Sequence, residues 1–169
     1  GTVRHAIRLE GDTTNFLTRV VCADNVVVGG FATISGVQYA VVSNNVMTSG
    51  DFASADSVWK IFDNVQYLTF SGNFIDRTSG TSLGVCISLE RANGNSPLYV
   101  RIGNNLLLNE KIGGGQVKVV DCTGFSIGAN LLRSSDIDAS NAYAIEVRAV
   151  TVNITDALIG PGNNFTSGA

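Results

Sequence analysis

The sequence predicts an all-β domain in which one chain winds into a β-solenoid of about six coils. Three observations predict this fold. A pattern of about 27 residues recurs along the chain, and its apolar residues alternate with the two-residue period of strands. Each of the first five copies also has an asparagine at the corner that follows its second strand. Such units cannot bury an apolar face alone, so we expect successive coils to stack.

The composition agrees with many short strands in one domain, residues 1–169. Only 15% of the residues are charged and 44% are hydrophobic, with 19 glycines and 2 prolines, which is unlike a disordered or collagen-like chain. Because the sequence starts inside a strand-like pattern, we expect it to be a fragment of a longer chain.

The clearest copy of the repeat lies at residues 57–78, SVWKIFDNVQYLTFSGNFIDRT. Leu68-Thr69-Phe70 alternates as a strand does, Ser71-Gly72-Asn73 interrupts it, and Phe74-Ile75 begins another strand. Aligning the copies divides the chain into coils at residues 5–30, 31–56, 57–83, 84–115, 116–142 and 143–169.

The first strand of each coil carries two apolar residues separated by a polar one. Alternation should point the apolar pair into the core and the polar residue to solvent. The expected inward pairs are Ile7/Leu9, Ala32/Ile34, Trp59/Ile61, Ile87/Leu89, Val117/Val119 and Ile145/Val147.

The second strand repeats this arrangement with two inward rows. One row is Cys22, Val42, Phe70, Ile102, Ile127 and Ile154, and the other is Val20, Ala40, Leu68, Val100, Phe125 and Val152. At the following corner stand Asn25, Asn45, Asn73, Asn105 and Asn130, with Ala157 in that place in the last coil. Asparagine tolerates left-handed backbone angles, and amides stacked at the ~4.8 Å strand spacing can bond one another along the solenoid.

The third strand offers two adjacent apolar residues in every coil, and a regular strand points only one of them inward. The expected outward row is Val26, Val46, Phe74, Leu106, Leu131 and Leu158. An apolar stripe of this length exceeds what monomers usually expose, so it predicts a homotrimer. The alternative is a bend at the asparagine corner that turns both residues inward.

Other features exclude several classes of site and partner. The three cysteines are scattered and are expected to be free thiols. His5 is the only histidine, which excludes a Ser-His-Asp or multi-histidine constellation within one chain, and we expect no metal and no cofactor. A net charge of −3 gives no basic footprint for nucleic acid, and no apolar run is long enough to predict a membrane span.

The repeated corner, apolar-x-apolar-x-x-Asn-x-apolar, resembles the right-handed parallel β-helix family, which includes pectate lyases and the trimeric tailspikes of bacteriophages. Copies such as VQYAVVSNNVM at 37–47 and LYVRIGNNLLL at 98–108 carry the resemblance. It implies three parallel sheets, a polysaccharide partner along an outer face, and a virion or extracellular location. No N-terminal capping helix like that of the family is evident in the sequence, and about six coils is short for a complete enzyme of it, so the chain looks most like a tailspike or tail-fibre segment.

The expected function is recognition of a bacterial surface polysaccharide by Tyr39, Tyr67, Tyr99 and Arg101. The tyrosines occupy one position in three successive coils, and alternation should turn their rings outward as a ladder of aromatic faces for sugars. Arg101 could bond hydroxyls or an acidic sugar. The alternative for this row is that the tyrosines stack to stabilise the sheet or contact another subunit.

A second possibility is a glycoside hydrolase or lyase that uses acids near the corner after the first strand. Asp63, Glu90 and Asp121 come from three consecutive coils. We expect Glu90 and Asp121 about 5 Å apart and Asp63 and Asp121 about 10 Å apart, roughly the separations of retaining and inverting glycosidases. A third possibility is a purely structural shaft.

Overall fold

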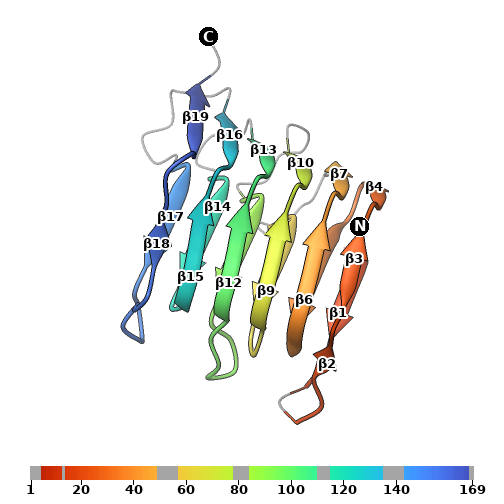
Figure 1. Cartoon of the computed structure of the whole chain (residues 1–169), viewed down its shortest axis with the longest axis vertical. Coiled ribbons are helices and arrows are strands. Elements are labelled where there is room, and N and C mark those ends of the chain that lie inside the picture. The colour runs from red at the N-terminus through yellow and green to blue at the C-terminus, as the bar shows by residue number, and fades with distance from the viewer. Residues whose placement is uncertain are drawn as a thin grey trace.

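The computed structural model describes residues 5–12, 14–48, 57–77, 84–109, 115–134 and 143–167. These residues form a parallel β-solenoid with three sheets, and no helix occurs among them. Strands of successive coils lie side by side along the stack, as β6, β9, β12 and β15 do in Figure 1. The all-β solenoid that the sequence predicts is therefore confirmed.

The first sheet takes one strand from each coil. Its strands are β1 (His5–Glu10), β5 (Phe31–Ser35), β8 (Trp59–Phe62), β11 (Ile87–Glu90), β14 (Val117–Val120) and β17 (Ile145–Arg148). In the four inner coils the predicted inward pairs are fully buried. In the end coils Ile7, Leu9 and Ile145 are only half-buried and Val147 is exposed, because each lies at an end of the stack.

The second sheet contains the longest strands. They are β2 (Leu17–Thr18) and β3 (Val21–Ala23), β6 (Val37–Ser43), β9 (Gln66–Ser71), β12 (Leu98–Gly103), β15 (Thr123–Gly128) and β18 (Leu158–Ile159). Both predicted inward rows are buried in the four inner coils. Phe70 contacts Trp59 of the first sheet edge to face, with ring centroids 5.2 Å apart, so the two sheets share one core.

The strands of the third sheet are regular, so only one residue of each adjacent apolar pair points inward. They are β4 (Val26–Val28), β7 (Val46–Thr48), β10 (Phe74–Arg77), β13 (Leu106–Asn109), β16 (Leu131–Ser134) and β19 (Asn164–Ser167). Met47, Ile75, Leu107 and Leu132 point inward and are buried. The residues that precede these four, together with Val26 before the half-buried Val27, form an outward row, which we call the apolar stripe: Val26, Val46, Phe74, Leu106 and Leu131.

The last coil differs from the prediction in its register. Ile159 pairs with Ile127, which places β18 in the second sheet, and Asn164 pairs with Leu131 in the third. The predictions that Ile154 belongs to the Ile127 row and that Leu158 belongs to the apolar stripe are therefore wrong, and so is the matching of Val152 to Phe125. The reason is that the chain turns at Pro161-Gly162, several residues later than the pattern suggested.

All six predicted coils contribute strands, but the closed core spans about four turns. Apart from Cys22 at 8% exposure, the buried hydrophobic residues of the described chain run from Ala32 to Leu132. Cys22, Cys86 and Cys122 are free thiols, and all three are buried. Burial raises the pKa of the Cys86 and Cys122 thiols to about 12.

A ladder of asparagine side chains runs along the corner between the second and third sheets. Each member donates its Nδ2 atom to the Oδ1 atom of the next, at 2.8–3.1 Å. The members are Asn25, Asn45, Asn73, Asn105, Asn130 and Asn163. The predicted bonding between amides is confirmed, and Asn163 rather than Ala157 holds the place in the last coil.

Candidate functional site

A stack of three tyrosines stands on the outer face of the second sheet. Tyr39, Tyr67 and Tyr99 are 57%, 46% and 57% exposed. Their ring centroids are 4.9 and 5.0 Å apart, with interplanar angles of 3° and 13°. Because the rings cover one another's faces, the stack presents mainly ring edges and hydroxyls to solvent. Tyr67 is covered on both sides by its neighbours, so the mutual stacking that was the alternative for this row is present, and the role of the row in binding stays a prediction.

A repeated backbone bend aims these rings outward. Tyr39, Tyr67 and Tyr99 each have φ of 55°, in the left-handed region, where an L-residue costs about 1–2 kcal/mol. The strand pairing joins residues on either side of each tyrosine and leaves the tyrosine itself unpaired, as in a bulge. The bend recurs along a column of equivalent positions: Arg19, Tyr39, Tyr67, Tyr99, Gly124 and Asp156.

Gly124 interrupts the side chains of this column just beyond Tyr99. A Cβ atom added to Gly124 would lie 3.1 Å from Cδ1 of Tyr99, so the tyrosine ring lies close over the glycine backbone. The next position in the column is Asp156. Two side chains, Tyr99 and Asp156, thus stand on either side of a position that has none.

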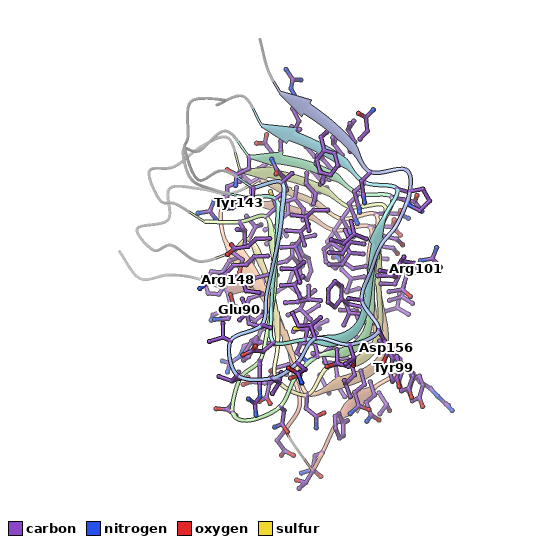
Figure 2. The ribbon with its side chains drawn as sticks, turned by 90° about the vertical axis from the view of Figure 1, so that its left-hand side faces the viewer. Glu90, Tyr99, Arg101, Tyr143, Arg148 and Asp156 are labelled. Carbon is purple, nitrogen blue, oxygen red and sulfur yellow. The ribbon has the colours of Figure 1, made fainter. Side chains whose placement is uncertain are left out.

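Arg101 lies in the neighbouring outward row, between Thr69 and Ser126. Its side chain is exposed, and within the described ranges no acceptor bonds its guanidinium. Figure 2 shows Tyr99, Arg101 and Asp156 on one side of the solenoid, with Glu90, Tyr143 and Arg148 on the opposite side. The predicted ligand-binding residues Tyr99 and Arg101 therefore share one face with Asp156, which sequence reasoning did not single out.

Two adjoining hollows lie on this face beside Tyr99. The first has a volume of about 300 Å³ and is lined by Tyr99, Arg101, Gly124, Ser126, Asp156 and Leu158, among others. The second, of about 310 Å³, shares Arg101, Ser126 and Leu158 with the first and extends to Asn104 and Pro161. The stack of rings thus ends at a shallow, open depression.

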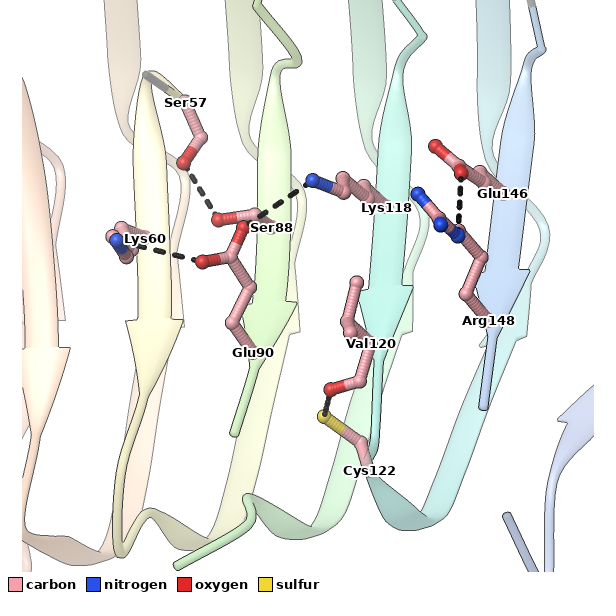
Figure 3. Close-up of polar contacts among 9 residues, drawn as sticks. All are labelled: Ser57, Lys60, Ser88, Glu90, Lys118, Val120, Cys122, Glu146 and Arg148. Atoms are coloured by element: carbon pink, nitrogen blue, oxygen red, sulfur yellow. Dashed lines mark hydrogen bonds and ion pairs between the residues drawn. The ribbon is translucent and has the colours of Figure 1, made fainter. Parts of the chain in front are cut away.

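Glu90, one of the three predicted catalytic acids, lies on the outer face of the first sheet. Its carboxylate lies between two cations, 3.4 Å from Lys60 Nζ and 3.8 Å from Lys118 Nζ (Figure 3). The register pairs Glu90 with Phe62 and Val120. Glu90 and Asp121 therefore do not lie in one row, contrary to the expectation. The carboxylate is half-buried and neutralised by its neighbours.

Asp63 and Asp121 both hold loops in place. Asp63 accepts hydrogen bonds from the side-chain amides of Asn93 and Asn95, at 3.1 and 3.0 Å. Asp121 is buried and accepts hydrogen bonds from the Thr151 hydroxyl and the Val150 amide, both at 2.6 Å, and these hold its pKa well below its usual range. All three acids therefore have structural partners, and their role in catalysis stays a prediction.

Comparisons with known proteins place no constraint on this site. Within the part of the chain that the structure describes, no three His, Cys, Asp or Glu side chains gather as a metal site would need. The same residues include no helix of the length and apolar character needed to span a bilayer. No protein-family model, curated protein or solved structure matches the chain, and its assignment as a parallel β-solenoid rests on its own strand pairings and buried rows.

Proposed function

We propose that this chain is the β-helical segment of a tailspike- or tail-fibre-like protein that binds a bacterial surface polysaccharide on the outer face of its second sheet. The observation that carries the proposal is the exposed stack of Tyr39, Tyr67 and Tyr99, which ends beside Arg101 and a hollow. Aromatic rings with polar edges suit sugars, which have apolar C–H faces and a polar rim. A free guanidinium adds strong, directional donors for hydroxyl or carboxylate groups.

The proposal includes assembly as a homotrimer through the apolar stripe of the third sheet. Val26 and Leu131 are 74% and 40% exposed, and Val46, Phe74 and Leu106 are half-buried between them. An apolar row on one sheet and a polar, aromatic face on another favour different partners for the two surfaces. Packing through the stripe would leave the tyrosine face open to a polysaccharide outside the virion or cell.

Binding of purified bacterial capsular and lipopolysaccharide glycans to the immobilised protein tests this function. We expect at least one glycan to bind, and Tyr99→Ala and Arg101→Ala to weaken it at least tenfold. Tyr67→Ala should weaken it less, because Tyr67 supports the covered face of Tyr99. Tyr143→Ala is the matched control, since Tyr143 is 56% exposed on the opposite side of the solenoid (Figure 2).

The same experiment separates the competing functions. If no glycan binds the parent protein, the proposal fails and a purely structural shaft is favoured. If all the variants bind as the parent does, the binding site lies on another face. Release of oligosaccharides during incubation would favour the hydrolase or lyase, and Glu90→Gln and Asp121→Asn would then show whether the acids carry it.

A further inference from the structure

The hollow beside Tyr99 has the form of a missing rung in the column of outward side chains. Strands stack ~4.8 Å apart, so positions two coils apart, such as those of Tyr99 and Asp156, are about 9.6 Å apart along the stack. The tyrosines themselves show that one flat ring fits each rung, because their centroids are 4.9 and 5.0 Å apart. Gly124 contributes no side chain to its rung, and the Tyr99 ring lies close over its backbone, so the open space is the hollow lined by Ser126, Asp156 and Leu158 beside that ring.

The walls of this hollow differ in chemistry. Tyr67 covers one face of the Tyr99 ring, the other face lies close over Gly124, and Tyr99 is among the residues that line the hollow. Asp156 and Arg101 line it with a carboxylate and a guanidinium, and in the described part of the chain neither has a hydrogen-bond or ion-pair partner. A ligand for this place needs an apolar ring face with both donors and acceptors on its rim.

From this geometry we infer that the hollow is a subsite for one pyranose ring of an oligosaccharide, an inference that rests on the proposed function. The apolar C–H face of the sugar packs on Tyr99, since aromatic rings bind such faces well. Sugar hydroxyls donate to the carboxylate of Asp156. Arg101 donates to hydroxyl oxygens, or to the carboxylate if the sugar is a uronic acid.

The second hollow gives the direction of the chain of sugars. It continues from Arg101 and Leu158 to Asn104 and Pro161, so the two hollows together follow strand β12 from Tyr99 to Asn104. Five residues of strand span roughly 16 Å, enough for about three pyranose units. The oligosaccharide therefore runs along the strands, from the Tyr99 end of the stack toward Asn104.

Filling the missing rung tests the subsite. Gly124 has φ of 64°, close to the 55° of the three tyrosines, so the backbone suits Gly124→Tyr. The added Cβ atom would lie 3.1 Å from Cδ1 of Tyr99, so the Tyr99 ring must shift by a few tenths of an ångström to let the stack extend. A fourth ring would occupy the subsite, and we expect binding of the glycan selected above to fall at least tenfold. Tyr143→Ala, on the opposite side of the solenoid, should leave binding within twofold of the parent.

Two further variants complete the design. Ser126→Tyr fills the same hollow from its floor and serves if Gly124→Tyr does not fold, with circular dichroism as the check. Arg101→Gln distinguishes the two kinds of sugar: it should weaken trigalacturonate much more than maltotriose or cellotriose if the subsite takes a uronic acid. If neutral sugars are the ligands, the loss should be similar for those that bind.

The outcomes separate this inference from the function on which it rests. If the parent binds a glycan and neither Gly124→Tyr nor Ser126→Tyr weakens it, the subsite is wrong while binding on this face can stand. If Gly124→Tyr lengthens the stack and strengthens binding, the subsite is likewise wrong, and contact of the glycan with the edges of the tyrosine rings is favoured. If the parent binds none of the polysaccharides or trisaccharides, both the function and the subsite are wrong.

Discussion

Asn105 donates two hydrogen bonds to the same atom of Asn130, one from its side-chain Nδ2 at 2.9 Å and one from its backbone amide at 3.1 Å. Asn73 makes the same pair of contacts to Asn105, at 3.0 and 2.9 Å. Asn105 also donates to the carbonyl oxygens of Phe70 and Gly103. A single buried side chain therefore satisfies polar groups of three successive coils.

Asn105→Ala should destabilise the protein by about 2–4 kcal/mol, because a buried polar group left without a partner costs about 1–3 kcal/mol. Urea unfolding followed by the fluorescence of Trp59, the single tryptophan, measures the loss. Asn163→Ala is the matched control and should cost less, since Asn163 is half-buried and ends the described ladder. Equal losses for the two variants would contradict a cooperative ladder.

Phe70→Ala should cost ~3–5 kcal/mol, the usual range for a large-to-small change in a closed core. Phe70 is fully buried against Trp59 and lies between Val42 and Ile102, so neighbouring coils can fill the cavity only in part. The same chemical change at Phe165, which is 56% exposed in the last coil, should cost under about 1 kcal/mol. A loss at Phe70 no larger than that at Phe165 would show that the inward rows do not form the core.

Asp121 should make stability depend on acidity. The Thr151 hydroxyl and the Val150 amide hold its pKa below the usual 3.8, so the unfolded chain takes up a proton at higher pH than the folded one. The stabilisation by Asp121 is therefore fully present above about pH 4 and is lost as the pH falls toward its folded pKa.

Urea unfolding of the parent protein and of Asp121→Asn checks this dependence. The variant should be less stable than the parent at pH 7, and the difference should shrink below about pH 4. Asp24→Asn is the control, because Asp24 is exposed and nothing in the described residues donates to its carboxylate. A difference between parent and Asp121→Asn that does not change with pH would contradict the assignment.

Phe74→Glu should break the proposed trimer, because it places a charge in the middle of the apolar stripe. Light scattering at micromolar concentration should give the parent a mass three times the 17.7 kDa of the chain, and the variant a smaller one. Val21→Glu is the control, since Val21 is 72% exposed on the second sheet. A parent protein that is monomeric, together with a harmless Phe74→Glu, would defeat the trimer.

The inner coils could be predicted because their signals agree. In the row of Phe70, Ile102 and Ile127, alternation fixes which residues point inward, and the asparagine corner fixes where each strand ends. A slip of one residue would turn every apolar side chain to solvent, so the register is strongly specified. The buried rows of these coils follow from sequence alone.

The last coil could not be predicted, because its local pattern offers two corners. The stretch VTVNITDALI imitates the alternation of a second strand, but the bond from the Asn130 backbone amide to Asn163 Oδ1 selects the later corner. This contact joins residues 33 positions apart. A local pattern of ten residues contains no information on this contact, so it places the corner at Ala157.

The candidate site was predictable only in part, for the same reason. The recurrence of Tyr39, Tyr67 and Tyr99 locates the face. The left-handed bend that stacks the rings could not be predicted, because tyrosine usually avoids that backbone conformation. The hollow depends on Asp156 and Leu158, whose places follow from the register of the last coil. The hollow therefore could not be predicted without the register of the last coil.

The asparagine ladder has a direction, since each amide accepts from the coil before it and donates to the coil after it. A whole coil inserted between Asn73 and Asn105 would receive two hydrogen bonds and give two, and no polar group would lose its partner. An insertion of half a coil would place an apolar residue, or no side chain, at the corner in place of asparagine. Buried hydrogen-bond donors would then lack acceptors. Gene duplication can therefore lengthen or shorten such a protein coil by coil, and natural variation in its length should come in steps of one repeat.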